Sequence, residues 1–410
     1  MKRFCGIDWA EARHDIAIVD DTGEVIERAR IGNDAAGFAG LLSLLADAGD
    51  TPEDPIPVAI EADRGLLVAA LRATSRAIYA IDPLSASRYR LRHQVAGAKS
   101  DATDAVMLAD ILRTDAGAHR RLPADTELGQ AIRVLARAQQ DAVWSRQQIG
   151  NQLRALLKDF YPAALDAFAG LSGGGLARPE ARVVLAAAPT PAAAAKLTPT
   201  KLGKLLVEAG RQRYIDRDVN RLLDVFGVPQ LWQPPVVENA MGIQLTALLG
   251  QFDAACRAAD ELAEAAMTHF DRHPDAKIIT SFPGLGQLTG ARVLAEIGDD
   301  PDRFTDPRGL KAYAGSAAIT RASGKKTVVL HRHIKNKRLA AVGPIWALAS
   351  PTASPGARCH FDARRAAGDW NHQAQRHLFN KFLGQLHHCL RTRSLYDEHR
   401  AFPPPVTLAA

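Results

Sequence analysis

The order of apolar runs in the first 120 residues constrains the fold more than any other feature of the chain. Three short strand-like runs separated by turns come first, and helical patterns then alternate with two further strand-like runs. The strand-like runs are at residues 4–8, 15–20, 24–31, 57–63 and 77–83, and the helical patterns are at 35–48 and 65–74. A meander followed by helix and strand alternation predicts a mixed α/β sheet covered by helices.

The rest of the chain is predicted to be mainly helical. Residues 127–160 keep apolar side chains at helical spacing for far longer than an average helix, and 245–270 form a second such run. The two runs fit a coiled-coil pairing, either within one chain or across a dimer. Pro- and Ala-rich segments between them are expected to connect small helices. The sequence "SFPGLGQLTGARVLAEIGD" at 281–299 fits a helix-hairpin-helix or a plain turn between two helices.

Composition limits the class of protein. A length of 410 residues suggests two or three domains, and 51 Lys and Arg against 45 Asp and Glu favour a polyanionic partner. The four cysteines show no C-x-x-C spacing, which indicates a reduced, intracellular protein. No signal peptide or membrane-spanning apolar run is visible, so we expect a cytoplasmic protein without membrane contact.

Four carboxylates are candidates for one site. Asp8 ends the first strand-like run, and Glu61 ends a later one. Asp101 and Asp104 lie in "KSDATDA", at the start of the helix that follows the sheet. Because strand ends of an open α/β layer meet at one edge, these side chains can converge, and their repulsion favours a bound cation. Oxygen ligands suit Mg²⁺, with Mn²⁺ as a substitute, whereas helix capping is the alternative role of the two aspartates on the helix.

The stretch from Pro307 to Leu339 is a second candidate surface, because it contains no acidic residue. Such complete segregation of charge favours contact with a polyanion over an ordinary solvated surface. Its basic residues are Arg308, Lys311, Arg321, Lys325, Lys326, Arg332, Lys335, Lys337 and Arg338. His331 and His333 alternate along the same stretch and suit phosphate contact more than catalysis.

These motifs together resemble the DEDD/Piv family of insertion-sequence transposases, the insertion-sequence-110 family of bridge-RNA-guided serine recombinases. "GIDWA", "IEAD" and "KSDATDA" are similar, in order and separation, to the D-E-D-D set of that family's RuvC-like domain. "PGLGQLTGARVLAEIGD" and the segments up to "RASGKK" and "IKNKRLAAV" are similar to its second, transposase domain. Family members usually have Lys-Arg-Gly-Asn after the serine hairpin, where this chain has "IKNKRLA".

The resemblance implies a domain layout, a set of partners and a set of site residues. It implies an RNase H/RuvC-like domain at 1–125, a helical linker, coiled-coil and dimerisation region at 126–275, and a mostly helical transposase domain at 276–400. The implied partners are donor and target DNA, a bridge RNA as guide, and further copies of the chain in a dimer or tetramer. The implied metal ligands are Asp8, Glu61, Asp101 and Asp104, and the implied nucleophile is Ser323 of "RASGKK".

Ser323 has neighbours that suit attack on phosphorus. Gly324 allows close backbone approach, and basic side chains can balance charge on the phosphate. Those basic side chains are Arg321, Lys325 and Lys326. On these residues alone a simple hairpin turn is the better description of Ser323-Gly324, and only the family resemblance favours a nucleophile. Ser316 in "YAGSAAIT" is the competing serine, which the resemblance aligns with a structural position.

Three functions are compatible with these patterns. The first is a DNA recombinase in which both domains form one composite site and a phosphoserine links protein to DNA. The second is a RuvC-like two-metal nuclease in which water attacks and Ser323 is only a turn. The third is a non-catalytic nucleic-acid-binding protein, which is disfavoured because a degenerate site has no reason to keep four repelling carboxylates.

Overall fold

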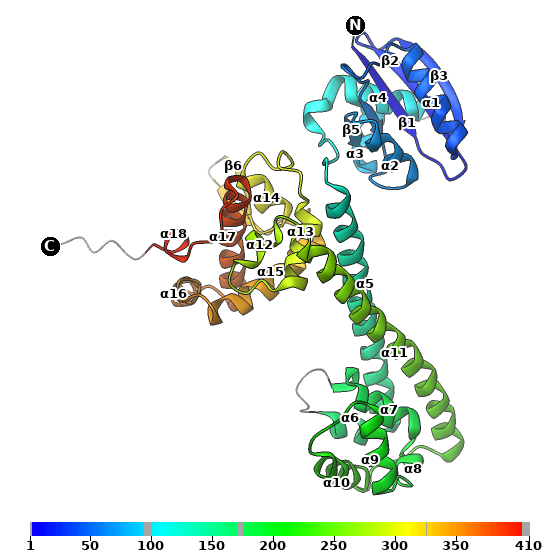
Figure 1. The fold of residues 1–410 in the computed structure, drawn as a ribbon, viewed down its shortest axis with the longest axis vertical. Helices are drawn as coiled ribbons and strands as arrows, with labels where there is room; N and C mark the ends of the chain where they lie inside the picture. Colours follow the sequence, from blue (N-terminus) through cyan, green and yellow to red (C-terminus); the bar gives the residue numbers. More distant parts are fainter. Residues whose placement is uncertain (1, 94–100, 170–174, 325, 404–410) are drawn as a thin grey trace, which may run out of the picture. The chain divides into compact units, whose positions relative to one another are not determined.

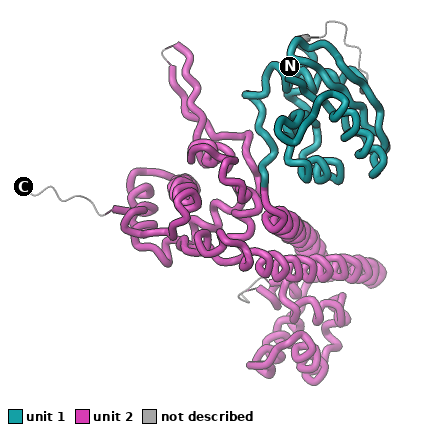
Figure 2. The backbone as a smooth tube through the Cα atoms, turned by 45° about the horizontal axis from the view of Figure 1, so that its top comes forward, with its two compact units in different colours: residues 1–124 teal, residues 125–410 magenta. Residues whose placement is uncertain are grey.

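The computed structural model describes residues 2–93, 101–169, 175–324 and 326–403. The chain divides into two compact units, Met1–Ala124 and Asp125–Ala410 (Figure 2). Among the described helices, none combines the length and the apolar character that crossing a membrane requires. The first unit carries the large sheet, and the second is helical apart from one hairpin.

Unit 1 is a five-stranded mixed sheet with helices on it, which confirms the predicted fold class (Figure 1). The strand order is β3-β2-β1-β4-β5, with antiparallel pairs β3–β2 and β2–β1 and parallel pairs β1–β4 and β4–β5. The strands are β1 (Arg3–Asp8), β2 (Arg13–Asp20), β3 (Val25–Gly32), β4 (Val58–Ile60) and β5 (Ile78–Ala80). The helices are α1 (Ala35–Asp47), α2 (Leu66–Ala73), α3 (Pro83–His93), α4 (Asp101–Asp115) and the short η1 (Ala116–Ala118).

Each face of this sheet has its own apolar core. Ile7 of β1 and Ile16 of β2 belong to one cluster, with Leu41 of α1 and Leu71 of α2. Ala59 of β4 belongs to another, with Leu108 and other residues of α4. Successive side chains of a strand point to opposite faces, so the alternating pattern of the sequence builds both layers.

Gly6 in β1 sets how closely α4 approaches the sheet. A Cβ atom at this position would lie 2.0 Å from the Ala105 carbonyl oxygen and 2.5 Å from the Ala109 nitrogen. The backbone of α4 therefore packs directly on the backbone of β1, and only a residue without a Cβ atom allows this contact. This contact fixes the part of α4 that carries Asp104 beside the end of β1.

We expect Gly6→Ala to push α4 off the sheet, at a cost of about 3 kcal/mol, since neither backbone can yield. Hydrogen exchange read by mass spectrometry should show faster exchange of the α4 amides. Gly40→Ala in α1 is the matched control, because no atom lies within 4 Å of a Cβ there and alanine is the better helix former. Unchanged protection of α4 in Gly6→Ala would contradict this account of the packing.

Unit 2 is built on two long helices, α5 (Glu127–Phe160) and α11 (Pro235–Asp271), which pack on each other within the chain. Helix α11 begins ten residues before the periodic run predicted at 245. Pro235 explains this difference, because proline at the first helical position has the right φ and needs no N–H partner. The pairing expected from the two apolar runs is therefore intramolecular.

The Pro- and Ala-rich segments between these helices are more than connectors. Prolines start four of the small helices there, and the helices pack on Leu157 and Phe160 of α5 and on Leu249 and Phe252 of α11. The elements are α6 (Pro162–Phe168), η2 (Gly175–Ala177), α7 (Pro179–Ala187), α8 (Pro191–Ala194), α9 (Pro199–Glu208) and α10 (Ile215–Phe226). They form a core of their own at one end of the long pair.

The opposite end of the long pair joins a second core, built around Trp346. The Trp346 ring centroid lies 5.1 Å from that of Phe382 and 5.7 Å from that of Phe282, and its Nε1 donates to the Pro283 carbonyl at 3.0 Å. The helices are α12 (Ala276–Thr280), α13 (Gln287–Ile297), α14 (Pro307–Tyr313), α15 (Lys337–Ala349), η3 (Ser350–Thr352), α16 (Pro355–Ala366), α17 (Asn371–Thr392) and α18 (Glu398–Ala401). The strands β6 (Ile319–Ser323) and β7 (Lys326–Leu330) form the hairpin.

The glycine turn between α12 and α13 serves packing. Gly284 has a φ of +81°, and a Cβ there would lie 2.7 Å from the Ser350 nitrogen. The turn is thus pressed against the end of α15. Gly286, which precedes α13, has open space around it. The sequence suggested that this turn contacts phosphate. That role stays a prediction, and only the backbone around Gly286 is open enough for it.

Candidate functional site

Three of the four candidate carboxylates lie at or beside one edge of the sheet of unit 1. Asp8 is the last residue of β1, and the parallel register pairs Ile7 with Ile60, so Asp8 and Glu61 leave the sheet side by side. Asp104 in α4 precedes Ala105, which rests on Gly6. We refer to Asp8, Glu61 and Asp104 as the carboxylate edge.

Asp101, the fourth candidate, begins α4, and its side chain lies outside the described part of the structure. Among the described side chains, no three His, Cys, Asp or Glu residues are grouped closely enough to hold a metal ion together. Both the capping role and the ligand role of Asp101 therefore stay predictions.

Asp104 has a cationic partner within unit 1. Its side chain is 7% exposed, and its Oδ1 accepts a hydrogen bond of 2.7 Å from a guanidinium nitrogen of Arg90 in α3. A carboxylate this buried needs an opposite charge, because desolvation penalises its ionised form. The guanidinium supplies that charge at the carboxylate edge.

Ser323 is the last residue of β6 and sits at the tip of the hairpin. It pairs with Lys326 across the turn, and Gly324 has a φ of +56°, which suits the tight connection. The hairpin projects from the body of unit 2 (Figure 2). Ser323 and its described neighbours on both strands are exposed, so the hydroxyl is accessible to a large substrate.

Ser316, the competing serine, is buried at 7% exposure. Its Oγ donates to the Lys311 carbonyl at 3.2 Å and accepts from Nδ2 of Asn380 at 3.0 Å. Both bonds hold Ser316 within the fold, which suits a structural role.

The basic residues of the acid-free stretch differ in their surroundings. Arg338 makes two hydrogen bonds to Asp141, at 2.8 and 2.9 Å, and its guanidinium carbon lies 5.0 Å from the centre of the Trp144 ring. This side chain holds α15 on α5. Nε of Arg332 donates to the Ala317 carbonyl at 3.3 Å.

Other cations of this stretch are exposed or border a cavity. The exposed ones are Arg308, Arg321, Lys326 and Lys337. Lys311 lies beside Gly384 and borders a cavity of about 530 Å³, and Lys335 borders another of about 440 Å³. Lys325 lies outside the described residues. The exposed group is the part of the stretch best placed to meet a polyanion in solution.

Sequence reasoning missed two cavity-forming side chains. Arg376 and His372 lie on α17, more than 30 residues beyond the acid-free stretch, yet they border the same cavity as Lys335. Their spacing of four residues puts both on one helix face. This spacing could have predicted that the two side chains lie together, but it does not indicate that they share a cavity with Lys335.

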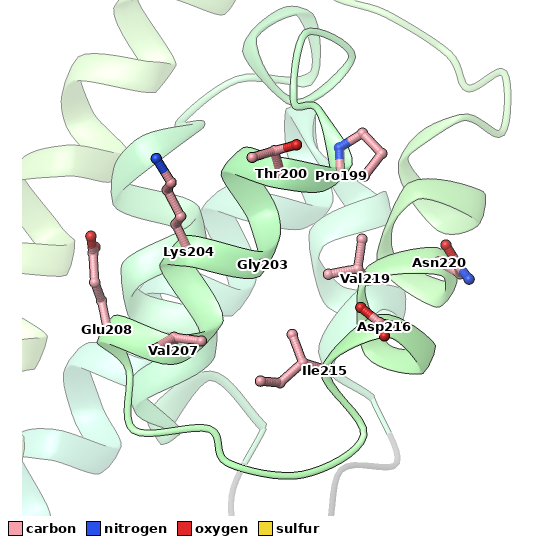
Figure 3. A pocket seen from close by; sticks show the side chains of 10 residues that line it. All are labelled: Pro199, Thr200, Gly203, Lys204, Val207, Glu208, Ile215, Asp216, Val219 and Asn220. Atoms are coloured by element: carbon pink, nitrogen blue, oxygen red, sulfur yellow. The ribbon is translucent and has the colours of Figure 1, made fainter.

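A further cavity of about 580 Å³ lies between α9 and α10 (Figure 3). Figure 3 shows Lys204 and Glu208 on α9 and Asp216 on α10, with Val207 and Ile215 between the two helices. Charges of both signs line it. It therefore lacks the single sign of charge that would select a polyanion.

Comparisons with known proteins match two segments of the chain, one from each end of it. A family model described as a transposase matches residues 5–162, which include all four candidate carboxylates. A second model, described as a transposase of the IS116/IS110/IS902 family, matches residues 276–353, which include Ser323.

Individual relatives cover the chain at greater length. A candidate mini-circle transposase for IS117 from Streptomyces coelicolor is 60% identical over 407 residues, 99% of this chain and 98% of that protein. A 43.6 kDa protein of insertion element IS110 from the same organism is 31% identical over 76% of this chain and 75% of its own length. A 42 kDa protein of insertion element IS900 from Mycobacterium paratuberculosis is 27% identical over 99% of this chain and 98% of its own.

Proposed function

This chain belongs to the IS116/IS110/IS902 family of transposases, and from that premise we propose that it cuts and rejoins DNA through a phosphoserine on Ser323. The observation that carries the proposal is the position of this hydroxyl. It stands exposed at the tip of a projecting hairpin, within a stretch of 33 residues that has no acidic side chain. A serine merely closing a turn has no need of such surroundings.

The chemistry exchanges one phosphoester bond for another. Ser323 Oγ forms a bond to phosphorus as the bond from phosphorus to a deoxyribose oxygen breaks. The serine proton passes to a carboxylate or hydroxide base, and the departing deoxyribose oxygen takes up a proton. A deoxyribose hydroxyl of another strand then attacks the phosphoserine and returns the proton to Ser323. Bond energy is conserved, so no external nucleotide is consumed.

Arg321 and Lys326 are the described cations nearest to Ser323 along the hairpin. Arg321 lies two residues before it on β6, on the same side of the strand, and Lys326 is its partner across the turn. Both offset negative charge that develops on the phosphate. Their exposure leaves them free to meet DNA.

The carboxylate edge has the donor type that a divalent metal prefers. Because its three described carboxylates are not grouped closely enough to hold a metal by themselves, the proposed site requires Asp101 or their closer approach. Its donors are all carboxylate oxygens, and the buried Asp104 already attracts a cation in the form of Arg90. We propose Asp8, Glu61 and Asp104, with Asp101, as ligands of Mg²⁺ or Mn²⁺. When bound, the metal would polarise a phosphate oxygen and assist proton removal.

Arg90→Gln tests whether a metal takes the place of the guanidinium. The variant should be less stable by about 2 kcal/mol without metal, because Asp104 is left buried without its partner. Millimolar Mg²⁺ should raise the melting temperature of the variant more than that of the wild type. Arg92→Gln, an exposed neighbour on α3, is the control. An equal response to Mg²⁺ in all three proteins would argue against a metal at Asp104.

Guidance by a bridge RNA and assembly into a dimer or tetramer are further parts of the proposal. The net positive charge of +6 suits two nucleic-acid partners. Large apolar side chains exposed near the start of α11 suit contact between copies of the chain. They are Leu231, Trp232, Val236 and Ile243.

The experiment that tests the proposed function is a search for a covalent adduct. Protein, Mg²⁺, guide RNA and end-labelled DNA of the insertion-sequence junction are incubated, denatured and separated on a gel. Label that migrates with the protein supports the phosphoserine. Cleaved DNA without an adduct would instead assign the chain to two-metal hydrolysis of the RuvC type.

A further inference from the structure

A cavity of about 440 Å³ lies at the base of the β6–β7 hairpin. The polar side chains that border it are Ser316, His331, Lys335, His372, Gln375 and Arg376. Ala340, Pro344 and Phe379 provide apolar wall. Its described lining contains no carboxylate, so the cavity has one sign of charge. We call it the hairpin-base pocket.

The two full cations of this pocket lack counter-ions. In the part of the chain that the structure describes, neither Lys335 nor Arg376 forms an ion pair. Partial desolvation lowers the pKa of His331, and the charges of Lys335 and Arg376 lower it further. The loop after β7, through Lys335, and helix α17, through Arg376, thus direct positive potential into one cavity, which is the condition under which an anion binds.

Lys335 is held in place before any ligand arrives. Its Nζ lies 2.9 Å from Nε2 of His331, which accepts a hydrogen bond when the ring is neutral. Its stem crosses Gly315, where a Cβ would come within 2.2 Å of the lysine Cδ. Gly315 also has a φ of +72°. Both this conformation and the close approach of the lysine stem favour glycine at position 315. A preorganised cation loses little conformational entropy on binding.

The pocket lies at a defined distance from Ser323 along the hairpin. Ile319 pairs with Leu330 at the base, and Ser323 pairs with Lys326 at the tip. Four residues of strand span about 13 Å, which matches phosphates roughly two nucleotides apart on one DNA strand, because a strand that winds around the duplex covers about twice the axial rise at each step. A strand held in the pocket by one phosphate can therefore present another phosphate at the tip.

We propose that the hairpin-base pocket binds a backbone phosphate of the DNA strand that is cut, a few nucleotides from the bond that Ser323 attacks. The assignment to the cut strand rests on the proposed function, because it takes Ser323 as the point of attack. The phosphate meets Lys335 and Arg376, and the attached sugar packs against Phe379 and Pro344.

The test is the salt dependence of DNA binding, measured in a Ser323→Ala background so that no chemistry occurs. Fluorescence anisotropy of a labelled DNA duplex is recorded over a range of salt concentrations. The double variant Lys335→Gln/Arg376→Gln should lower the slope of log K against log salt by about 1, since both cations serve a single phosphate contact, which contributes roughly 0.9. The control Lys277→Gln/Arg358→Gln removes two exposed cations elsewhere in unit 2 and should leave the slope unchanged.

A second variant separates the pocket from general surface charge. Ala340→Leu keeps every charge but fills the cavity from α15, and it should lower the slope by a similar amount. An unchanged slope in either pocket variant, an equal loss in the control, or a loss seen only with an RNA probe would overturn the inference. The adduct experiment uses the wild-type serine and does not depend on this binding measurement. Phosphate binding in the pocket and the phosphoserine on Ser323 can therefore be refuted separately.

Discussion

Ser323→Ala should eliminate the covalent adduct and, with it, recombination, by at least about 10³-fold. Replacing the hydroxymethyl side chain by methyl removes the oxygen atom of this residue that would form the ester. Stability should change by less than about 0.5 kcal/mol, because the side chain is exposed at a hairpin tip. The measurement combines the denaturing gel with a thermal melt of the same preparation. Loss of adduct without loss of folding separates a chemical role from a structural one.

Thr327→Val is the matched control for this variant. Thr327 carries an exposed hydroxyl on the facing strand, and valine preserves its shape and strand preference. The control should form the adduct at the wild-type level. An adduct that persists in Ser323→Ala would assign the nucleophile to another residue, and the hairpin tip would then not be the point of attack on DNA.

Glu61→Gln should abolish Mg²⁺-dependent cleavage while the fold stays intact. The amide retains the size of the side chain but loses the charge that attracts a divalent cation. Because like charges repel at the carboxylate edge, the metal-free variant should be as stable as the wild type or slightly more so. Cleavage is measured across a Mg²⁺ titration, and stability by thermal unfolding without metal.

Asp63→Asn provides the comparison for Glu61→Gln. Asp63 follows β4 by three residues and is exposed, so it loses the same charge in the same segment. It should keep normal activity. Full Mg²⁺-dependent cleavage by Glu61→Gln, or an equal loss in Asp63→Asn, would contradict the assignment of the carboxylate edge.

Local patterns in the sequence were enough to predict the sheet of unit 1. Alternation of apolar residues defined the strands, and strand ends pointed to Asp8 and Glu61, which the parallel register of β1 and β4 then places next to each other. The contact of Gly6 with Ala105 joins residues 99 positions apart, and no local pattern encodes it. The same holds for Arg90, whose pairing with Asp104 depends on how α3 and α4 pack.

In unit 2 the limits of sequence reasoning have a similar origin. The periodic run at 245–270 predicted a helix, but the earlier start at Pro235 depended on recognising proline at a helix start rather than in a loop. Arg338 looked equivalent to its basic neighbours until α5 supplied Asp141 and Trp144. The hairpin-base pocket combines α17 with residues that flank the hairpin, so only the tertiary fold reveals it.

The antiparallel pairing of α5 and α11 has a consequence for how such proteins can change in length over evolution. Leu157 and Leu249 share the core at one end of the pair, whereas Ile132 and Phe270 share the core at the other. An insertion in one helix alone would shift its apolar face by about 100° per residue and break the match. Lineages with a longer or shorter arm should therefore carry compensating insertions or deletions in both helices, in steps of about seven residues.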